Sequence, residues 1–215
     1  MSGTLTLYGF SYSSASYRAR IALNLKGLAY ERVSIKVPAG EQHTPAYEAL
    51  NPERLIPTLR HGDVTITQSL AIALYLDEVF PEPPLRAATA VERAHSLAFA
   101  LAVACDIHPL NNTRVLSYLT GPLGQSEAAK QAWYEHWIAE GLRRLETIMA
   151  RRAIQSPFCF GEAPGIADIC LIPQLANVRR MKCDVAPYPT LTRIEANCLA
   201  LDAFRSAMPE NQPKA

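Results

Sequence analysis

The chain has 215 residues, enough for one large domain or two small ones. Hydrophobic residues make up 49% of it, which supports a packed core and argues against a disordered protein. Lysine and arginine together number 21, against 20 aspartates and glutamates, so the charge gives no case for binding nucleic acid or an anionic membrane. No apolar run is long enough to cross a bilayer.

The amino terminus and the cysteines favour a cytoplasmic protein. The opening MSGTLTLYGF lacks the basic and then apolar layout of a secretory signal peptide. The five cysteines are odd in number, widely spaced and without a CxxC pair. We therefore expect reduced thiols that act as small core residues, and no metal site. The cysteines are Cys105, Cys159, Cys170, Cys183 and Cys198.

The first third of the chain alternates strands and helices. The alternating TLTLYGF predicts a strand over 4–10, and the next periodic segment predicts a helix over 16–26 that Gly27 ends. Further expected elements are a strand over 30–37, a helical turn in PAYEAL, two short strands in LIPTLRHGDVTIT and a helix over 69–80. This order, β-α-β-α-β-β-α, predicts a small α/β domain.

A proline-rich stretch, PEPPLRAATA, separates this part from a helical one. We therefore expect a first domain over 1–82, a linker over 83–89 and an all-α domain over 90–215. Helices are predicted over 91–119, from Ser126 onward, in the apolar GIADICLIPQLANVRRM and in PTLTRIEANCLAL. The apolar helix is expected to be buried in the middle of this domain, with Asp168 near its start in a folding role.

Ser13 and Ser14 stand just before the first predicted helix. A helix amino terminus exposes unpaired N–H groups with partial positive charge, so it can hold an anion. Serine hydroxyls at that point could donate to the anion. The alternative is that one serine is simply an N-cap, and both interpretations can hold for different serines.

Six segments of the chain carry a family resemblance. They are SSASYRARIALNLKGLAYE, LNPERLIPTL, ITQSLAIALYL, CDIHPLNNTRVLSYL, IADICLIPQLANVRRMKCDVAPYPT and AFRSAMPENQP. They resemble the zeta-class glutathione transferases, in the same order and almost from end to end. The resemblance implies a thioredoxin-like domain followed by a helical bundle domain. It also implies a glutathione-dependent isomerase that converts maleylacetoacetate or maleylpyruvate to the fumaryl isomer.

The resemblance also implies a glutathione site in the first domain. Ser13, with Ser14 as the alternative, would donate to the glutathione sulfur, while Ala15 stands where zeta enzymes commonly carry a cysteine. Pro57 would be a cis-proline that presents the backbone of Ile56 to glutathione. Gln68 and Ser69 would hold the γ-glutamyl end. The competing interpretations are an ordinary trans proline at a strand edge and a plain helix cap at Ser69.

A maleyl substrate also needs cations for its carboxylates, and the planar fork of arginine suits them. By resemblance these are Arg180 in NVRRMKCD and Arg114 in HPLNNTRVL, with His108 and Asn112 lining the pocket. The alternatives are that the two arginines are solvated surface residues and that His108 has a structural role.

Two other functions stay open. One is a zeta-like transferase that conjugates or dehalogenates small electrophiles such as α-halo acids, because the same thiolate serves both reactions. The other is a protein of this fold that only binds or assembles. The partners implied by the resemblance are glutathione, a small dicarboxylate and a second copy of the chain in a homodimer.

Overall fold

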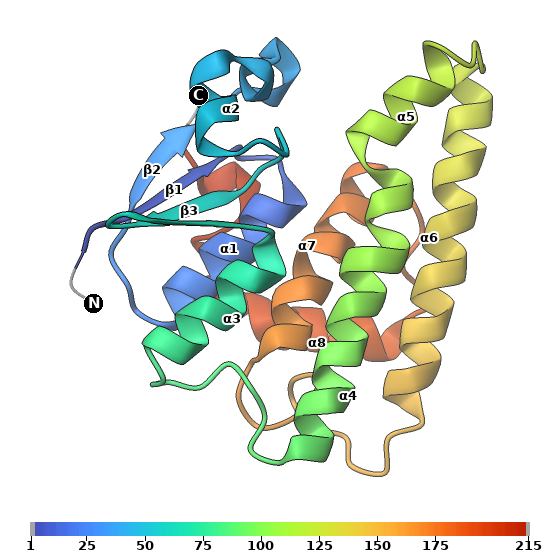
Figure 1. Ribbon diagram of the computed structural model, residues 1–215. Helices are drawn as coiled ribbons and strands as arrows, with labels where there is room; N and C mark the ends of the chain where they lie inside the picture. Colours follow the sequence, from blue (N-terminus) through green and yellow to red (C-terminus); the bar gives the residue numbers. More distant parts are fainter. Residues whose placement is uncertain (1–2, 214–215) are drawn as a thin grey trace. The chain divides into compact units, whose positions relative to one another are not determined.

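The computed structural model describes residues 3–213 and divides into two compact units (Figure 1). The first unit contains the chain up to Arg86 together with the segment that begins at Leu199, and the second is Ala87–Cys198. The first unit is a sheet with helices and the second is helical, which confirms the predicted fold class.

The first unit contains one mixed sheet with the strand order β2-β1-β3-β4. Strand β2 runs parallel to β1, whereas β1 with β3 and β3 with β4 are antiparallel. Helices α1 and α3 pack side by side on one face (Figure 1). The elements are β1 (Leu5–Gly9), α1 (Ser14–Leu25), β2 (Glu31–Ser34), α2 (Pro45–Leu50), β3 (Thr58–His61), β4 (Val64–Thr67) and α3 (Ser69–Val79). Each of them was predicted, with ends that differ by a few residues.

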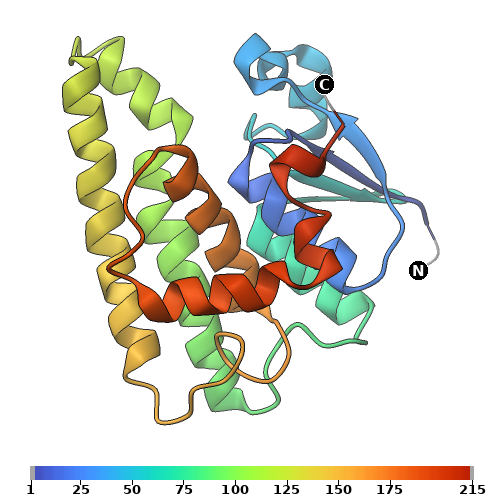
Figure 2. The same cartoon turned by 180° about the vertical axis from the view of Figure 1, so that it is seen from behind.

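The C-terminal segment packs against α1, which differs from the predicted boundary. Residues 199–215 were expected to belong to the helical domain, but the described part of this segment groups with the first unit (Figure 2). The reason is a set of contacts from α1 to α9 (Asp202–Arg205) and the residues after it. The Tyr17 hydroxyl donates to the carbonyl of buried Phe204 at 3.2 Å, and Arg20 Nε donates to the carbonyl of Ala207 at 2.9 Å.

The second unit is built around α7, which is almost entirely buried. Asp168 in its first turn is 1% exposed, and its carboxylate accepts from the N–H groups of Gly165 and Cys159, both at 2.9 Å. These bonds confirm the predicted folding role of Asp168. The helices of this unit are α4 (Ala90–Leu101), α5 (Thr113–Thr120), α6 (Glu127–Ala150), α7 (Ile166–Arg180) and α8 (Pro189–Leu199).

The prediction of a single helix over 91–119 is wrong. Helix α4 ends at Leu101, and a π-helical turn over Ala102–Ile107 and a 3₁₀ turn over Pro109–Asn111 precede α5. Proline 109 has no N–H to continue an α-helix. The π turn also lies very close to α6, because a Cβ added to Gly141 would come within 2.5 Å of Ile107. Helical turns with π geometry are rare and frequently occur at functional sites.

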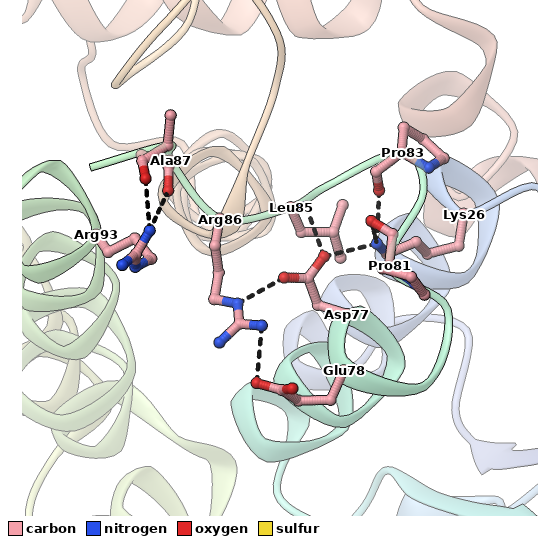
Figure 3. A network of polar contacts seen from close by, with 10 residues as sticks. Lys26, Asp77, Glu78, Pro81, Pro83, Leu85, Arg86, Ala87 and Arg93 are labelled. Carbon is pink, nitrogen blue, oxygen red and sulfur yellow. Dashed lines mark hydrogen bonds and ion pairs between the residues drawn. The ribbon is translucent and has the colours of Figure 1, made fainter. Parts of the chain in front are cut away.

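A buried ionic network joins the end of α3 to the chain that follows it (Figure 3). Lys26 Nζ donates to Asp77 Oδ1 at 2.6 Å and to the Pro83 carbonyl at 2.5 Å. Asp77 also accepts from the N–H of Leu85 at 2.7 Å and from Arg86 Nε at 2.6 Å. The side chains of Lys26 and Asp77 are 0% and 3% exposed. The carboxylate therefore fixes the exit from α3 through three separate donors.

Replacing Asp77 by asparagine should destabilise the protein by about 3 kcal/mol, because it leaves the Lys26 ammonium buried without its carboxylate. Urea unfolding at neutral pH measures the loss. Glu78→Gln is the matched control, since Glu78 is 67% exposed and Arg86 is its one ion-pair partner among residues 3–213, so we expect it to cost less than about 1 kcal/mol. Equal losses in the two variants would contradict a special role for the buried pair.

The same network makes the stability of the protein depend on pH. Burial opposes ionisation of Asp77, but the bonds from Lys26, Leu85 and Arg86 outweigh it and lower its pKa below 3.8. The stabilisation is therefore complete above about pH 4 and is lost as the pH falls through the lowered pKa. The Asp77→Asn variant should accordingly lose less stability than the parent protein on acidification.

Candidate functional site

The register of three strands brings three chain segments to one end of the sheet. Tyr8 at the end of β1 pairs with Thr58 at the start of β3, and Thr58 pairs with Thr67 at the end of β4. The loop that enters α1, the Ile56–Pro57 bond before β3 and the Gln68–Ser69 step into α3 therefore meet at this end. All the residues predicted to bind glutathione lie in these three segments.

Ser13 is the N-cap of α1, as one of the two interpretations of the serines predicted. Its Oγ accepts from the N–H of Ser16 at 3.2 Å. A hydroxyl has one hydrogen to donate besides its two lone pairs, so the capping bond leaves the O–H available for an anion. Ser14 is the first residue of the helix and is 6% exposed, whereas Ser13 is half-buried. Ser13 therefore caps the helix with its oxygen and keeps its O–H group as a donor for a ligand.

The Ile56–Pro57 peptide bond is cis, as predicted, and a buried network holds the loop before it. The Asn51 side-chain amide donates to the Leu55 carbonyl at 2.8 Å and to Thr58 Oγ1 at 3.0 Å. The Tyr47 hydroxyl donates to the same Leu55 carbonyl at 2.7 Å. Sequence reasoning missed this network, although Asn51 lies in the LNPERLIPTL motif, where an Asn-Pro step six residues before Pro57 marks the loop.

Gln68 leads into α3 with a backbone that non-glycine residues rarely adopt. Its φ is 65°, and its side-chain Nε2 donates to Glu53 Oε2 at 3.1 Å. No side chain caps α3, so the interpretation of Ser69 as a plain cap is not observed; Ser69 is the first helical residue and is 6% exposed. Unusual backbone conformations of this kind cluster at functional sites. The contact of Glu53 with Gln68 was not predicted from the sequence.

The electrostatics at this end of the sheet favour anions. Helices α1 and α3 both begin here, and neither has an acidic residue in its first turn. A helix amino terminus carries roughly half a positive charge, and its N–H groups point outward. Two unneutralised helix termini and the Ser13 hydroxyl can therefore hold two anionic groups, such as a thiolate and a carboxylate.

In the second unit, three predicted residues form one local group after the π turn. Asn112 Nδ2 lies 3.3 Å from His108 Nε2, and Asn112 Oδ1 accepts from the N–H of Arg114 at 3.1 Å. The amide and the imidazole are thus within hydrogen-bond distance of each other. Asn112 is thus the N-cap of α5 and orients the imidazole, while the Arg114 side chain is exposed.

Arg180 lies in the last turn of α7, beside a second arginine with a different environment. Arg179 is bound to the carboxylate of Glu195 through Nε at 3.1 Å and Nη2 at 2.5 Å, and Glu195 is buried. Arg180 is exposed, and its Nη2 donates to Asn177 Oδ1 at 2.9 Å. Of the two neighbours, Arg179 is therefore structural and Arg180 presents its guanidinium at the surface of the unit.

Two features are absent from residues 3–213. No group of three or more histidine, cysteine, aspartate or glutamate side chains is arranged to hold a metal ion. None of the helices in that range is both long and apolar enough to pass through a membrane.

Comparisons with known proteins agree with this geometry. Residues 7–84 match the family model of the glutathione S-transferase N-terminal domain, and residues 127–207 match that of its C-terminal domain. A probable maleylacetoacetate isomerase of Vibrio cholerae is 46% identical, with 99% of each chain covered. The similarity to this relative therefore extends over nearly the whole chain.

Two solved structures are similar throughout. A holo maleylpyruvate isomerase, described as a bacterial glutathione S-transferase of the zeta class, has a TM-score of 0.95 at 42% identity and covers 98% of this chain and 99% of its own. A maleylacetoacetate isomerase from Methylobacterium extorquens, solved with malonate and glutathione, has a TM-score of 0.94 at 41% identity, with coverages of 97% and 98%. The chain belongs to the glutathione S-transferase family, in its zeta class.

Proposed function

We propose that this protein is a glutathione-dependent cis–trans isomerase that converts a maleyl compound, maleylacetoacetate or maleylpyruvate, to its fumaryl isomer. The observation that carries the proposal is the end of the sheet where Ser13, the cis Ile56–Pro57 bond and the uncapped start of α3 meet. Relatives at 41–46% identity that carry these enzyme names support it.

The residues at this end of the sheet fit glutathione. The run from Ser13 to Ser16 contains no cysteine, so a thiol must come from a ligand if sulfur chemistry takes place here. The Ser13 hydroxyl would donate to that sulfur and favour its thiolate, helped by the dipole of α1. The main chain of Ile56 would pair with the peptide backbone of the ligand. Gln68, Ser69 and the N–H groups of α3 would hold a carboxylate.

Bound glutathione supplies the thiolate that adds to the cis double bond, so that the bond becomes single, rotates and closes as trans when the thiolate leaves. Side chains and backbone groups of the protein supply the other interactions of the reaction. Ser13 and the helix terminus hold the negative charge on sulfur before and after the addition. Arg180 would bind a substrate carboxylate, because its side chain is exposed at the end of α7 and a guanidinium can bind a carboxylate bidentately.

Arg114, His108 and Asn112 would complete the substrate pocket. Asn112 contacts the His108 imidazole at Nε2, so the two side chains would line the pocket together. We also propose that the chain acts as a homodimer in the cytoplasm, on family resemblance and on the five free cysteines.

The direct test uses enzymatically generated maleylpyruvate and maleylacetoacetate, with and without glutathione, followed by absorbance. We expect isomerisation only with glutathione, faster for one substrate than for the other, and the faster one identifies the physiological reaction. If glutathione binds but neither compound isomerises, the proposal is wrong, and turnover of α-halo acids or a halogenated aromatic would point to conjugation or dehalogenation.

Ser13→Ala should raise the pKa of the bound glutathione thiol and lower kcat roughly 100-fold, the scale of losing one donor to a developing anion. Ultraviolet absorbance of the thiolate gives the pKa. Ser126→Ala is the matched control, because Ser126 caps α6 through a 3.1 Å bond to the N–H of Ala129. Both variants lose about 1 kcal/mol of cap stability. An unchanged thiolate signal in Ser13→Ala would shift the role to Ser14.

Arg180→Gln should lower kcat/KM for the maleyl substrate by roughly 10- to 100-fold and leave glutathione affinity unchanged, since charge-assisted bonds contribute about 1.5–3 kcal/mol. Steady-state kinetics with each substrate varied separately measures both. Arg179→Gln serves for comparison: it should destabilise the fold through the loss of the Glu195 pair, with little change in KM. The same KM change in both variants would argue against a substrate role for Arg180.

A further inference from the structure

The first unit contains a cavity that none of the proposed glutathione residues lines. It has a volume of about 190 Å³ and is lined by residues of α1, of strands β1 and β2 and of the C-terminal segment at Gln212. At about 30 Å³ per water molecule this is room for roughly six waters, or for an organic molecule of a few carbon atoms. We propose that this cavity is a second ligand site, which binds a small organic carboxylate.

Two arginines at the cavity supply the positive charge. Arg20 is 3% exposed, and it donates to neutral carbonyls, among them those of Ala207 at 2.9 Å and Ser11 at 3.0 Å. Arg32 on β2 is exposed and donates from Nη1 to Gln212 Oε1 at 2.6 Å. Over the described range 3–213, no carboxylate lies within 4.0 Å of either guanidinium. Buried charges are normally paired, so the cavity has a charge to be balanced.

The two guanidinium groups also repel each other. Burial lowers the pKa of Arg20 to about 10, and the charge of Arg32 acts in the same direction. Tyr30, Tyr17 and Glu210 act in the opposite direction without restoring the ordinary value. A carboxylate in the cavity would attract both cations and so remove a repulsion that the protein alone retains.

The rest of the lining selects an organic anion over an inorganic one. Leu7 and Val33 contribute apolar surface, and Ser34 adds a hydroxyl. Val33 is 38% exposed although it is β-branched and lies on a strand, so apolar surface is left open here for a ligand to cover. Gln212 holds Arg32 in place, because its Nε2 is itself anchored on the carbonyls of Ser206 at 2.8 Å and Met208 at 2.9 Å. The site therefore has a fixed cation next to an apolar wall.

The test is calorimetric titration of butanoate into the full chain, with glutathione present at saturation, in parallel with 1-butanol and inorganic phosphate. We expect millimolar binding of butanoate and at least fivefold weaker binding of both other probes. Arg32→Gln should weaken butanoate at least fivefold, while Arg32→Lys should retain part of the affinity. Arg60→Gln is the matched control, since Arg60 is exposed on β3 outside the cavity, and should leave the affinity within twofold.

Several results would overturn the proposal. Absence of heat up to high millimolar butanoate means that the cavity binds no carboxylate. Equal binding of phosphate means that only charge is recognised, and equal weakening by Arg60→Gln means nonspecific attraction. Loss of binding in Arg180→Gln, with Arg32→Gln unaffected, would assign the heat to the proposed substrate pocket instead. Arg32 is at the surface, so circular dichroism should show each variant folded before titration.

Discussion

The candidate site depends on one constraint, the pairing of β1, β3 and β4 at Tyr8, Thr58 and Thr67. Side chains alternate across a strand, so a slip of one residue would turn every side chain of a strand to the other face. The buried Asn51 amide bonds Thr58 at 3.0 Å and thereby ties the loop before the cis bond to that register. The Ser13 hydroxyl and the start of α3 reach the same end of the sheet only because these pairings hold.

Helix α1 connects this site to the stability of the first unit. Its first residues carry the cap and the donor at Ser13, its middle binds the C-terminal segment through Tyr17 and Arg20, and Lys26 at its end enters the Asp77 network. Buried Tyr17, Arg20 and Lys26 each have named hydrogen-bond partners, as low-dielectric surroundings favour. A change at either end of α1 therefore acts on the fold as well as on the chemistry.

Local patterns in the sequence predicted the strands, most helices and the start of a helix at Ser126, because these depend on neighbouring residues. The break in the helix over 102–112 was missed although Pro109 is visible in the sequence, whereas the close approach of Gly141 on α6 to Ile107 appears only in the fold. The placement of the C-terminal segment was missed because Tyr17 and Phe204 meet across 187 positions. The site residues followed from family resemblance, whereas Asn51 and Glu53, which hold the site, become visible only through their hydrogen bonds.

The two adjacent arginines of α7 can be distinguished by their partners in the folded structure. Arg179 and Arg180 have the same side chain and the same helix, and periodicity alone cannot rank them. Buried Glu195 on α8 binds Arg179 through both Nε and Nη2, so charge pairing commits that guanidinium to the fold although its side chain is 50% exposed. Arg180, one position further around the helix, keeps an exposed charge. If this charge binds substrate, the Glu195 pair has a second effect: it withholds a competing cation, so that a dicarboxylate meets one guanidinium at this helix end rather than two.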